Sequence, residues 1–366
     1  MPPRDASAPP PGSADDKLIG IELLRFASAV AVLVFHYQHF AYVGTSLTNF
    51  HPAAQPFYGA LRLFYDYGFC GVEVFWCISG FIFFWKYGEV VSQKRMAGRK
   101  FFVLRMSRLY PLHIATLLFI AAMQFVYSLK LGEFFIYPNN DVVHFILQIF
   151  MASNWSTRFG DSFNGPIWSI SIEVLTYCIF FLSLRYISAS VAFIGAVAVA
   201  AAGVLFLKIS AHPLFNCLMF FYLGGLVAAL YSRAKAAAGW KVIATGAAVA
   251  CLAIAIGLPM FHPVTPLHLL VIFSPALIFL SVMYVPGTPL VSRLLAAAGN
   301  MTYSSYLLHV PIQITIATIA AYAHWSIPMY TAWFFIGFLI VTLVLSYCCY
   351  VAFEMPMQSY LRRRFR

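Results

Sequence analysis

Charged residues are scarce in this chain. Only 10% of its 366 residues are charged, whereas 62% are hydrophobic and the mean hydropathy is +0.82. One soluble core has too little interior to hide that much apolar surface, so the composition excludes an ordinary soluble domain. The apolar runs are long and continuous, and a helix satisfies its own backbone polar groups in hydrocarbon. We therefore expect helices that use lipid as their solvent.

Motifs for disulfides and metals are missing as well. The seven cysteines lie almost entirely inside apolar runs, and no CxxC or His/Cys spacing marks a metal site. Cys70 and Cys77 share a helix face, where thiols usually behave as small hydrophobic groups. No internal repeat is visible, which weighs against a transporter built from inverted halves. We expect neither a metal site nor a disulfide framework.

The apolar runs predict an all-α fold, a polytopic transmembrane helix bundle of about ten spans. The first run is too long for the core of a signal peptide, so it should remain in the mature protein. The apolar stretch 141–152 is short and is predicted to be an interfacial or re-entrant helix. The predicted spans are 18–40, 69–87, 101–129, 166–186, 189–207, 213–231, 240–258, 266–285, 298–322 and 328–353.

The 23 Lys and Arg residues predict the orientation of this bundle. An even number of spans with both termini in the cytoplasm places most of them in cytoplasmic loops, as the positive-inside rule requires. Orientation and contact with anionic lipid then explain the net charge of +11, and no nucleic acid is needed. The predicted organisation is a disordered cytoplasmic tail at 1–17, a membrane domain at 18–356 and a basic cytoplasmic tail at 357–366.

The first span carries two ionisable side chains, each of which costs several kcal/mol in hydrocarbon unless it is paired or faces a polar cavity. Arg25 and His36 are three helical turns apart, so they share one face and lie about 16 Å apart along the axis. The predicted orientation puts Arg25 toward the cytoplasm and His36 toward the outer end. The alternative is structural: Arg25 pairs with Glu22, and a neighbour satisfies His36.

Two arginines stand at the cytoplasmic start of the third span. Arg105 and Arg108 are at positions i and i+3, so both guanidinium groups point the same way and can clamp phosphate oxygens. The alternative is ordinary positive-inside charge.

A third pattern runs from Asn164 to Glu173. Pro166 suits the first turn of a span that enters from outside, so Glu173 lies about 10 Å below the start of that helix, near the level of His36. A carboxylate there would fix the tautomer of an imidazole and raise its basicity. The alternative is a glutamate bonded to the backbone of a neighbouring broken helix.

Together these patterns resemble the membrane-bound acyltransferase 3 family, which includes bacterial exopolysaccharide and lipopolysaccharide O-acetyltransferases. The resemblance runs from about Ile19 to Pro356, although the family often carries Asp where this chain has Glu22. The motifs that carry it are Leu24-Arg25-Phe-Ala with His36, Phe75-Trp-Cys-Ile-Ser-Gly80-Phe, Arg105 and Arg108 with Arg-Leu-Tyr-Pro, Trp168-Ser-Ile-Ser-Ile-Glu173, Tyr306-Leu-Leu-His309 and Phe353-Glu354-Met-Pro356.

The resemblance implies an O-acetyltransferase of the inner, cytoplasmic membrane. Arg25 and His36 would belong to the active site, and Arg105 and Arg108 would help to hold a cytoplasmic acyl-CoA, usually acetyl-CoA, as a co-substrate without any permanently bound cofactor. The implied acceptor is a sugar hydroxyl of a lipid-linked oligosaccharide or of an envelope or extracellular polysaccharide. Partner proteins of polysaccharide assembly are expected around such an enzyme.

The chemistry of coenzyme A fits this arrangement. Its phosphates cannot enter lipid, so its nucleotide end should stay at the inner face on Arg105, Arg108 and Arg25. The slim pantetheine arm would thread the bundle and present its thioester near His36.

At that point His36 would act as general base toward the acceptor hydroxyl. Glu173 would orient His36, and Trp168 or Ser169 would line the acceptor side. A covalent acyl-His36 intermediate is the alternative route.

Other interpretations remain open at this stage. His309 either assists catalysis or is a packed, hydrogen-bonded core histidine. The chain as a whole is alternatively a transporter or flippase for a lipid-linked glycan, or a non-catalytic membrane partner in polysaccharide assembly.

Overall fold

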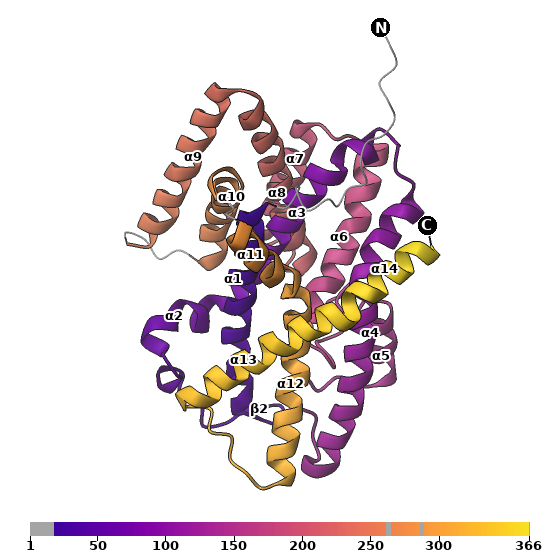
Figure 1. The fold of residues 1–366 in the computed structure, drawn as a ribbon, viewed down its shortest axis with the longest axis vertical. Coiled ribbons are helices and arrows are strands. Elements are labelled where there is room, and N and C mark those ends of the chain that lie inside the picture. The colour runs from indigo at the N-terminus through magenta and orange to yellow at the C-terminus, as the bar shows by residue number, and fades with distance from the viewer. Residues whose placement is uncertain (1–17, 261–264, 286–288, 366) are drawn as a thin grey trace.

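The computed structural model describes residues 18–260, 265–285 and 289–365 as a bundle of helices (Figure 1). The tail predicted over 1–17 lies outside the described residues. Within them the β-structure is one small ribbon of two antiparallel strands, β1 (Tyr42–Val43) and β2 (Ser46–Leu47). The helices are α1 (Ile19–His36), α2 (Tyr58–Tyr67), α3 (Gly71–Ser92), α4 (Gly98–Leu131), α5 (Val142–Ile149), α6 (Ile167–Tyr186), α7 (Val191–Phe206), α8 (Pro213–Ala236), α9 (Ala238–Gly257), α10 (Pro266–Tyr284), α11 (Pro289–Asn300), α12 (Thr302–Tyr322), α13 (Ala332–Cys349) and α14 (Met355–Arg364).

The helices confirm a polytopic membrane bundle. In the described part of the chain, 9 helical segments are long and apolar enough to cross a membrane. The remaining predicted span forms α7, whose 16 residues extend roughly 24 Å at the α-helical rise. Leu18 and Arg362, near the two ends of the chain, line one and the same cavity. The start of α1 and the end of α14 therefore lie at the same end of the bundle.

Three boundaries differ from the prediction. A separate helix, α2, precedes α3, and the break falls at Gly68, where a side chain would lie 2.1 Å from the carbonyl oxygen of Ala31 on α1. The predicted span 298–322 is broken at Met301, between α11 and α12. Most of the segment predicted as a basic tail forms α14, which continues α13 through a π-helical turn at Tyr350–Glu354.

Two glycines allow α3 and α8 to cross in close contact. A Cβ atom at Gly80 would lie 1.8 Å from the carbonyl oxygen of Phe221, and one at Gly224 would lie 2.0 Å from that of Cys77. Small residues let helix backbones approach in a membrane, where lipid tails compete with apolar side chains for packing. The crossing buries Phe81 and Phe221 completely and holds α3 in place beside the site described below.

This crossing predicts a large penalty for one methyl group. We expect Gly224→Ala to lower the stability of the purified protein by about 1–3 kcal/mol, because the new methyl group overlaps a backbone carbonyl that cannot move aside. Thermal unfolding in detergent, followed by size-exclusion chromatography, measures the effect. Gly246→Ala on α9 is the matched control, since a Cβ atom there meets no other group within 4 Å. Equal melting temperatures for the two variants would contradict the proposed role of the crossing.

A proline in α12 connects this helix to the segment before α6. Pro311 has no N–H group, so the carbonyl of Leu307, one turn earlier, loses its helical partner. The side chain of Asn164 donates to that carbonyl at 3.1 Å. The Asn164-Gly-Pro sequence is thereby fixed to α12, and it sets where α6 begins.

The segment between α4 and α6 folds back against the bundle. The Gln124 side chain exchanges two hydrogen bonds with the backbone of Phe135, at 2.8 and 2.9 Å. Helix α5 has 8 residues and is too short to cross a membrane. Asp141 caps its first turn by accepting a hydrogen bond from the backbone N–H group of His144, and this bond lowers the pKa of Asp141. The short helix fits the predicted interfacial segment.

Candidate active site

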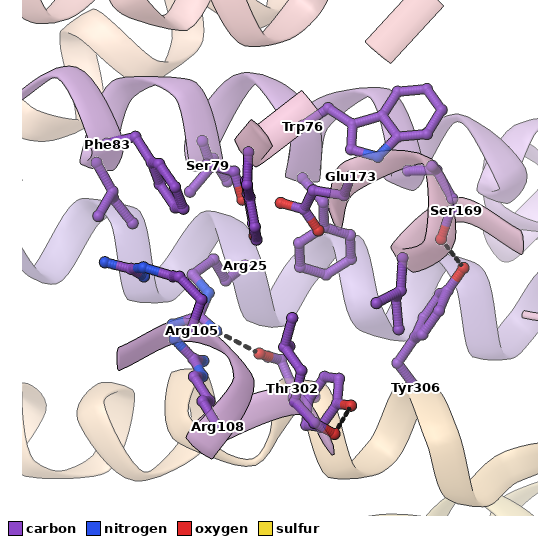
Figure 2. Close-up of a pocket in the computed structure, with 18 residues that line it drawn as sticks. Arg25, Trp76, Ser79, Phe83, Arg105, Arg108, Ser169, Glu173, Thr302 and Tyr306 are labelled. Atoms are coloured by element: carbon purple, nitrogen blue, oxygen red, sulfur yellow. Dashed lines mark hydrogen bonds between the residues drawn. The ribbon is translucent and has the colours of Figure 1, made fainter. Parts of the chain in front are cut away.

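Two adjoining cavities lie within the bundle, and three arginines line both of them. The inner pocket, lined by α1, α3, α4, α6 and α12, has a volume of about 120 Å³. The second cavity, here called the vestibule, has a volume of about 300 Å³ and lies where α1 begins and α14 ends. Arg25, Arg105 and Arg108 belong to both linings. The structure thus gathers the three arginines selected from the sequence at one junction (Figure 2).

Arg25 is fixed by two side chains. Its guanidinium group lies 3.1 Å from the Glu22 carboxylate and donates to the Thr302 hydroxyl, also at 3.1 Å. The pairing with Glu22 confirms the structural alternative for this residue, but Arg25 still lines both cavities. The ion pair and the function are compatible, because Glu22 orients the guanidinium group without removing it from the junction.

Arg105 is held by aromatic rings. Its guanidinium carbon lies 4.3 Å from the ring centroid of Phe83 and 4.5 Å from that of Tyr87. Such stacking stabilises a cation with little use of its hydrogen-bond donors. The buried Nε atom of Arg105 has no hydrogen-bond partner in the described part of the chain. Arg105 therefore keeps donors for an anion, as Arg108 does one turn further along α4.

Glu173 lies in the inner pocket on the same side as the predicted donor site. The three arginines interact electrostatically with its carboxylate, and Ser79 and Tyr177 lie next to it. Its Oε1 atom is buried and has no hydrogen-bond partner among the described residues. Figure 2 shows Glu173 between the arginines and the far end of the pocket.

A hydrogen bond between two hydroxyl groups lies at that far end. Ser169 Oγ and the Tyr306 hydroxyl lie 2.8 Å apart, and both residues line the inner pocket (Figure 2). Trp168, the other residue predicted on the acceptor side, is not among the lining residues. Its ring packs edge-on against Trp76, which does line the pocket, at a centroid distance of 5.7 Å.

His36 is not among the residues that line either cavity and lies in a cluster of three histidines. Its ring stacks on that of His309 at 5.0 Å, with His36 Nδ1 3.2 Å from His309 Nε2, and the His39 ring lies 4.8 Å away. Gln313 joins the cluster: its amide donates to the His36 carbonyl at 2.8 Å, and its oxygen lies 3.0 Å from His39 Nδ1. Tyr306 is the link to the pocket, because its ring lies 6.0 Å from that of His309.

The hydrogen bonds of the cluster assign its tautomers. His309 Nδ1 faces the Ser305 carbonyl at 3.3 Å and must donate to it, so in the neutral ring His309 Nε2 is an acceptor. His36 Nδ1 then donates to His309 Nε2, which leaves the lone pair of His36 on Nε2. His309 and His39 are buried, whereas His36 is half-buried. The arrangement presents His36 Nε2 as a base or nucleophile with a fixed ring orientation.

Besides the position of Trp168, the partner of His36 differs from the sequence-based prediction. The partner of His36 Nδ1 is His309, where the sequence analysis had placed Glu173. Sequence reasoning missed Thr302 and Gln313 and left the role of His309 open. With Tyr306 these residues lie on one face of α12, at positions i, i+4, i+7 and i+11: Thr302, Tyr306, His309 and Gln313. A polar stripe at this spacing in an otherwise apolar helix was the signal that could have found them.

The segment between α5 and α6 carries a half-buried carboxyl group, that of Asp161. Asp161 accepts a hydrogen bond from Asn154 at 3.1 Å, and burial raises the pKa of this carboxyl group above its ordinary value. No group of three or more His, Cys, Asp or Glu side chains is placed to hold a metal ion anywhere in the described ranges.

Comparison with known proteins gives one match. A family model described as an acyltransferase domain matches residues 18–351, which include every residue of the cavities up to Tyr350 and the whole histidine cluster. No curated protein and no solved structure matches this chain.

Proposed function

Taking as a premise that this chain belongs to the acyltransferase 3 family and is a multi-pass membrane acyltransferase, we propose that it transfers an acyl group, most simply acetyl, from cytoplasmic acyl-CoA to a sugar hydroxyl of an envelope or extracellular polysaccharide. The vestibule faces the cytoplasm in this proposal, with both chain termini on that side. The enzyme then resides in the inner, cytoplasmic membrane and joins a donor on one side to an acceptor on the other.

One observation carries the proposal: the arginine junction and the histidine cluster lie on the same two helices. Arg25 and His36 are on α1, and Thr302 and His309 are on α12. Hydrogen bonds join these helices at both levels, from Arg25 to Thr302 and from His36 to His309. The two connected helices would thus hold an anionic nucleotide at the arginines and the base His36 at a fixed distance from each other.

The chemistry follows from the tautomers. His36 Nε2 accepts the proton of the acceptor hydroxyl, and the oxygen attacks the thioester carbonyl. The C–S bond breaks, and the sulfur of CoA leaves with a proton supplied by the imidazolium. The acyl group would reach His36 past the hydrogen-bonded Ser169–Tyr306 pair, since Tyr306 lines the inner pocket and its ring lies 6.0 Å from that of His309. Glu173, beside the arginines, would position the donor end and not the imidazole.

The experiment that tests the proposal measures O-acyl esters directly. Proton NMR of envelope and secreted polysaccharide, before and after mild base, would compare cells that make the wild type, His36→Ala or no protein. Membrane levels of both forms are checked by immunoblot. We expect an ester signal with the wild type alone, and the shifted sugar proton then identifies the acceptor hydroxyl. Altered glycan export with unchanged esters would favour a transporter or flippase instead.

A further inference from the structure

The C-terminal helix adds a cation to the vestibule from outside the matched family segment. Arg362 on α14 lines the vestibule, and the family model ends at residue 351. Helix α14 lies across α4, the helix that carries the arginine pair (Figure 1). Arg362 is oriented by two long contacts to α4, from its Nε to the Ser107 hydroxyl and from a terminal nitrogen to the Leu104 carbonyl, both at 3.4 Å.

The vestibule concentrates positive charge beyond what its carboxylates balance. Five basic residues line it together with two glutamates: Arg25, Lys86, Arg105, Arg108 and Arg362 against Glu22 and Glu354. Glu22 is used by Arg25, and Glu354 accepts a hydrogen bond from Ser304 at 2.6 Å. Arg105, Arg108 and Arg362 have no ion pair to a carboxylate in the described ranges, and they repel one another. Like charges held together in this way favour a bound polyanion.

The position of Arg362 distinguishes it from the other arginines. Arg105 and Arg108 line both cavities, whereas Arg362 lines only the wider vestibule. In acyl-CoA the pyrophosphate joins the pantetheine arm, and the 3′-phosphate lies further out on the ribose. An arm that enters the inner pocket leaves the pyrophosphate at the junction and the 3′-phosphate in the vestibule.

We infer that Arg362 binds the 3′-phosphate of the acyl-CoA donor, and that α14 thereby makes the site selective for 3′-phosphorylated coenzyme A. The inference rests on the proposed function, since it assumes that the donor is acyl-CoA. It assigns the pyrophosphate to Arg105 and Arg108, and it gives the segment beyond the matched family region a role in substrate selection.

Isothermal titration of the full-length protein in detergent with CoA and with 3′-dephospho-CoA tests the inference. We expect Arg362→Ala to weaken CoA binding about tenfold, the size of one charge-assisted hydrogen bond, and to leave dephospho-CoA binding unchanged. Unchanged binding of dephospho-CoA also shows that the arginine junction on α1 and α4 remains intact. Arg108→Ala should weaken both ligands. Arg364→Ala removes the same charge from an exposed position of α14 and should weaken neither.

The other outcomes distinguish a failure of the proposed function from a failure of the Arg362 assignment. If the folded wild type binds neither ligand, the proposal of an acyl-CoA donor fails and the inference fails with it. If the wild type binds CoA and Arg362→Ala binds it equally well, the inference fails and the proposed function stands. If Arg362→Ala weakens both ligands equally, or if Arg364→Ala matches it, the assignment to the 3′-phosphate is wrong.

Discussion

Acyl transfer is expected to fall about 10³-fold when His36 is replaced by alanine, the range typical for removal of a general base. Binding of acetyl-CoA should persist, because His36 is not among the residues that line the inner pocket or the vestibule. Transfer of a labelled acetyl group from acetyl-CoA to glycan in isolated membranes, alongside titration of acetyl-CoA binding, measures both quantities. We expect the rate of acetyl transfer to fall while the affinity for acetyl-CoA stays the same.

A surface histidine provides the control for this experiment. His324 is exposed and has a positive φ of 52°, a conformation that asparagine tolerates, so His324→Asn should behave as the wild type. If His36→Ala loses acetyl-CoA binding in proportion to its rate, His36 serves the donor site and is not the base. If the rate is retained, the assignment of the active site is wrong.

A single turnover without acceptor separates the two chemical routes. If His36 Nε2 attacks the thioester itself, acetyl-CoA should release one CoA per protein and leave an acetyl group on the histidine. If His36 acts only as a base, CoA release should require the acceptor. The same measurement on His36→Ala gives the background.

The second large effect is expected at His309. Its Nε2 atom accepts a hydrogen bond from His36 Nδ1–H. This bond fixes which nitrogen of His36 carries the lone pair. Replacement by leucine removes that acceptor, and we expect kcat to fall about 10²-fold while the KM for acetyl-CoA changes little. His309→Gln should recover part of kcat, because the side-chain amide oxygen can accept the same proton. Kinetic assay of the two variants in proteoliposomes measures the difference.

Glu173 is the comparison that makes this result decisive. The sequence analysis assigned to Glu173 the orienting role that the hydrogen bonds give to His309. Loss of a donor-side carboxylate should appear in the KM for acetyl-CoA, since Glu173 lies in the inner pocket beside the arginines. If Glu173→Gln lowers kcat alone and His309→Leu is silent, the original assignment is right. Equal kcat for His309→Leu and His309→Gln variants would mean that His309 acts only by packing.

The sequence was sufficient for those features that depend on local spacing. Apolar run length predicted the bundle, and the i, i+3 spacing predicted that Arg105 and Arg108 share a cavity. Each of these follows from one helix and its own periodicity.

Features that depend on which helices are neighbours could not be predicted from the same reasoning. His309, the partner of His36, is 273 positions away in the chain, and Thr302, the second partner of Arg25, is 277 positions away. Spacing along α1 puts His36 on a face but says nothing about which helix covers that face. Likewise, a run of arginines at the C-terminus reads as a tail until α14 is seen against α4.

The bond between Asn164 and the carbonyl exposed by Pro311 has a consequence for the order of synthesis. Its two residues are 143 positions apart, and the Asn164 loop emerges from the ribosome long before α12 does. During that interval the loop lacks the partner that fixes the start of α6, Arg25 lacks Thr302, and His36 lacks His309. The site therefore stays incomplete through most of translation. Insertion of α12 then completes the arginine junction and the histidine cluster together. A chain that stops before α12 would retain its early spans in the membrane and still be inactive.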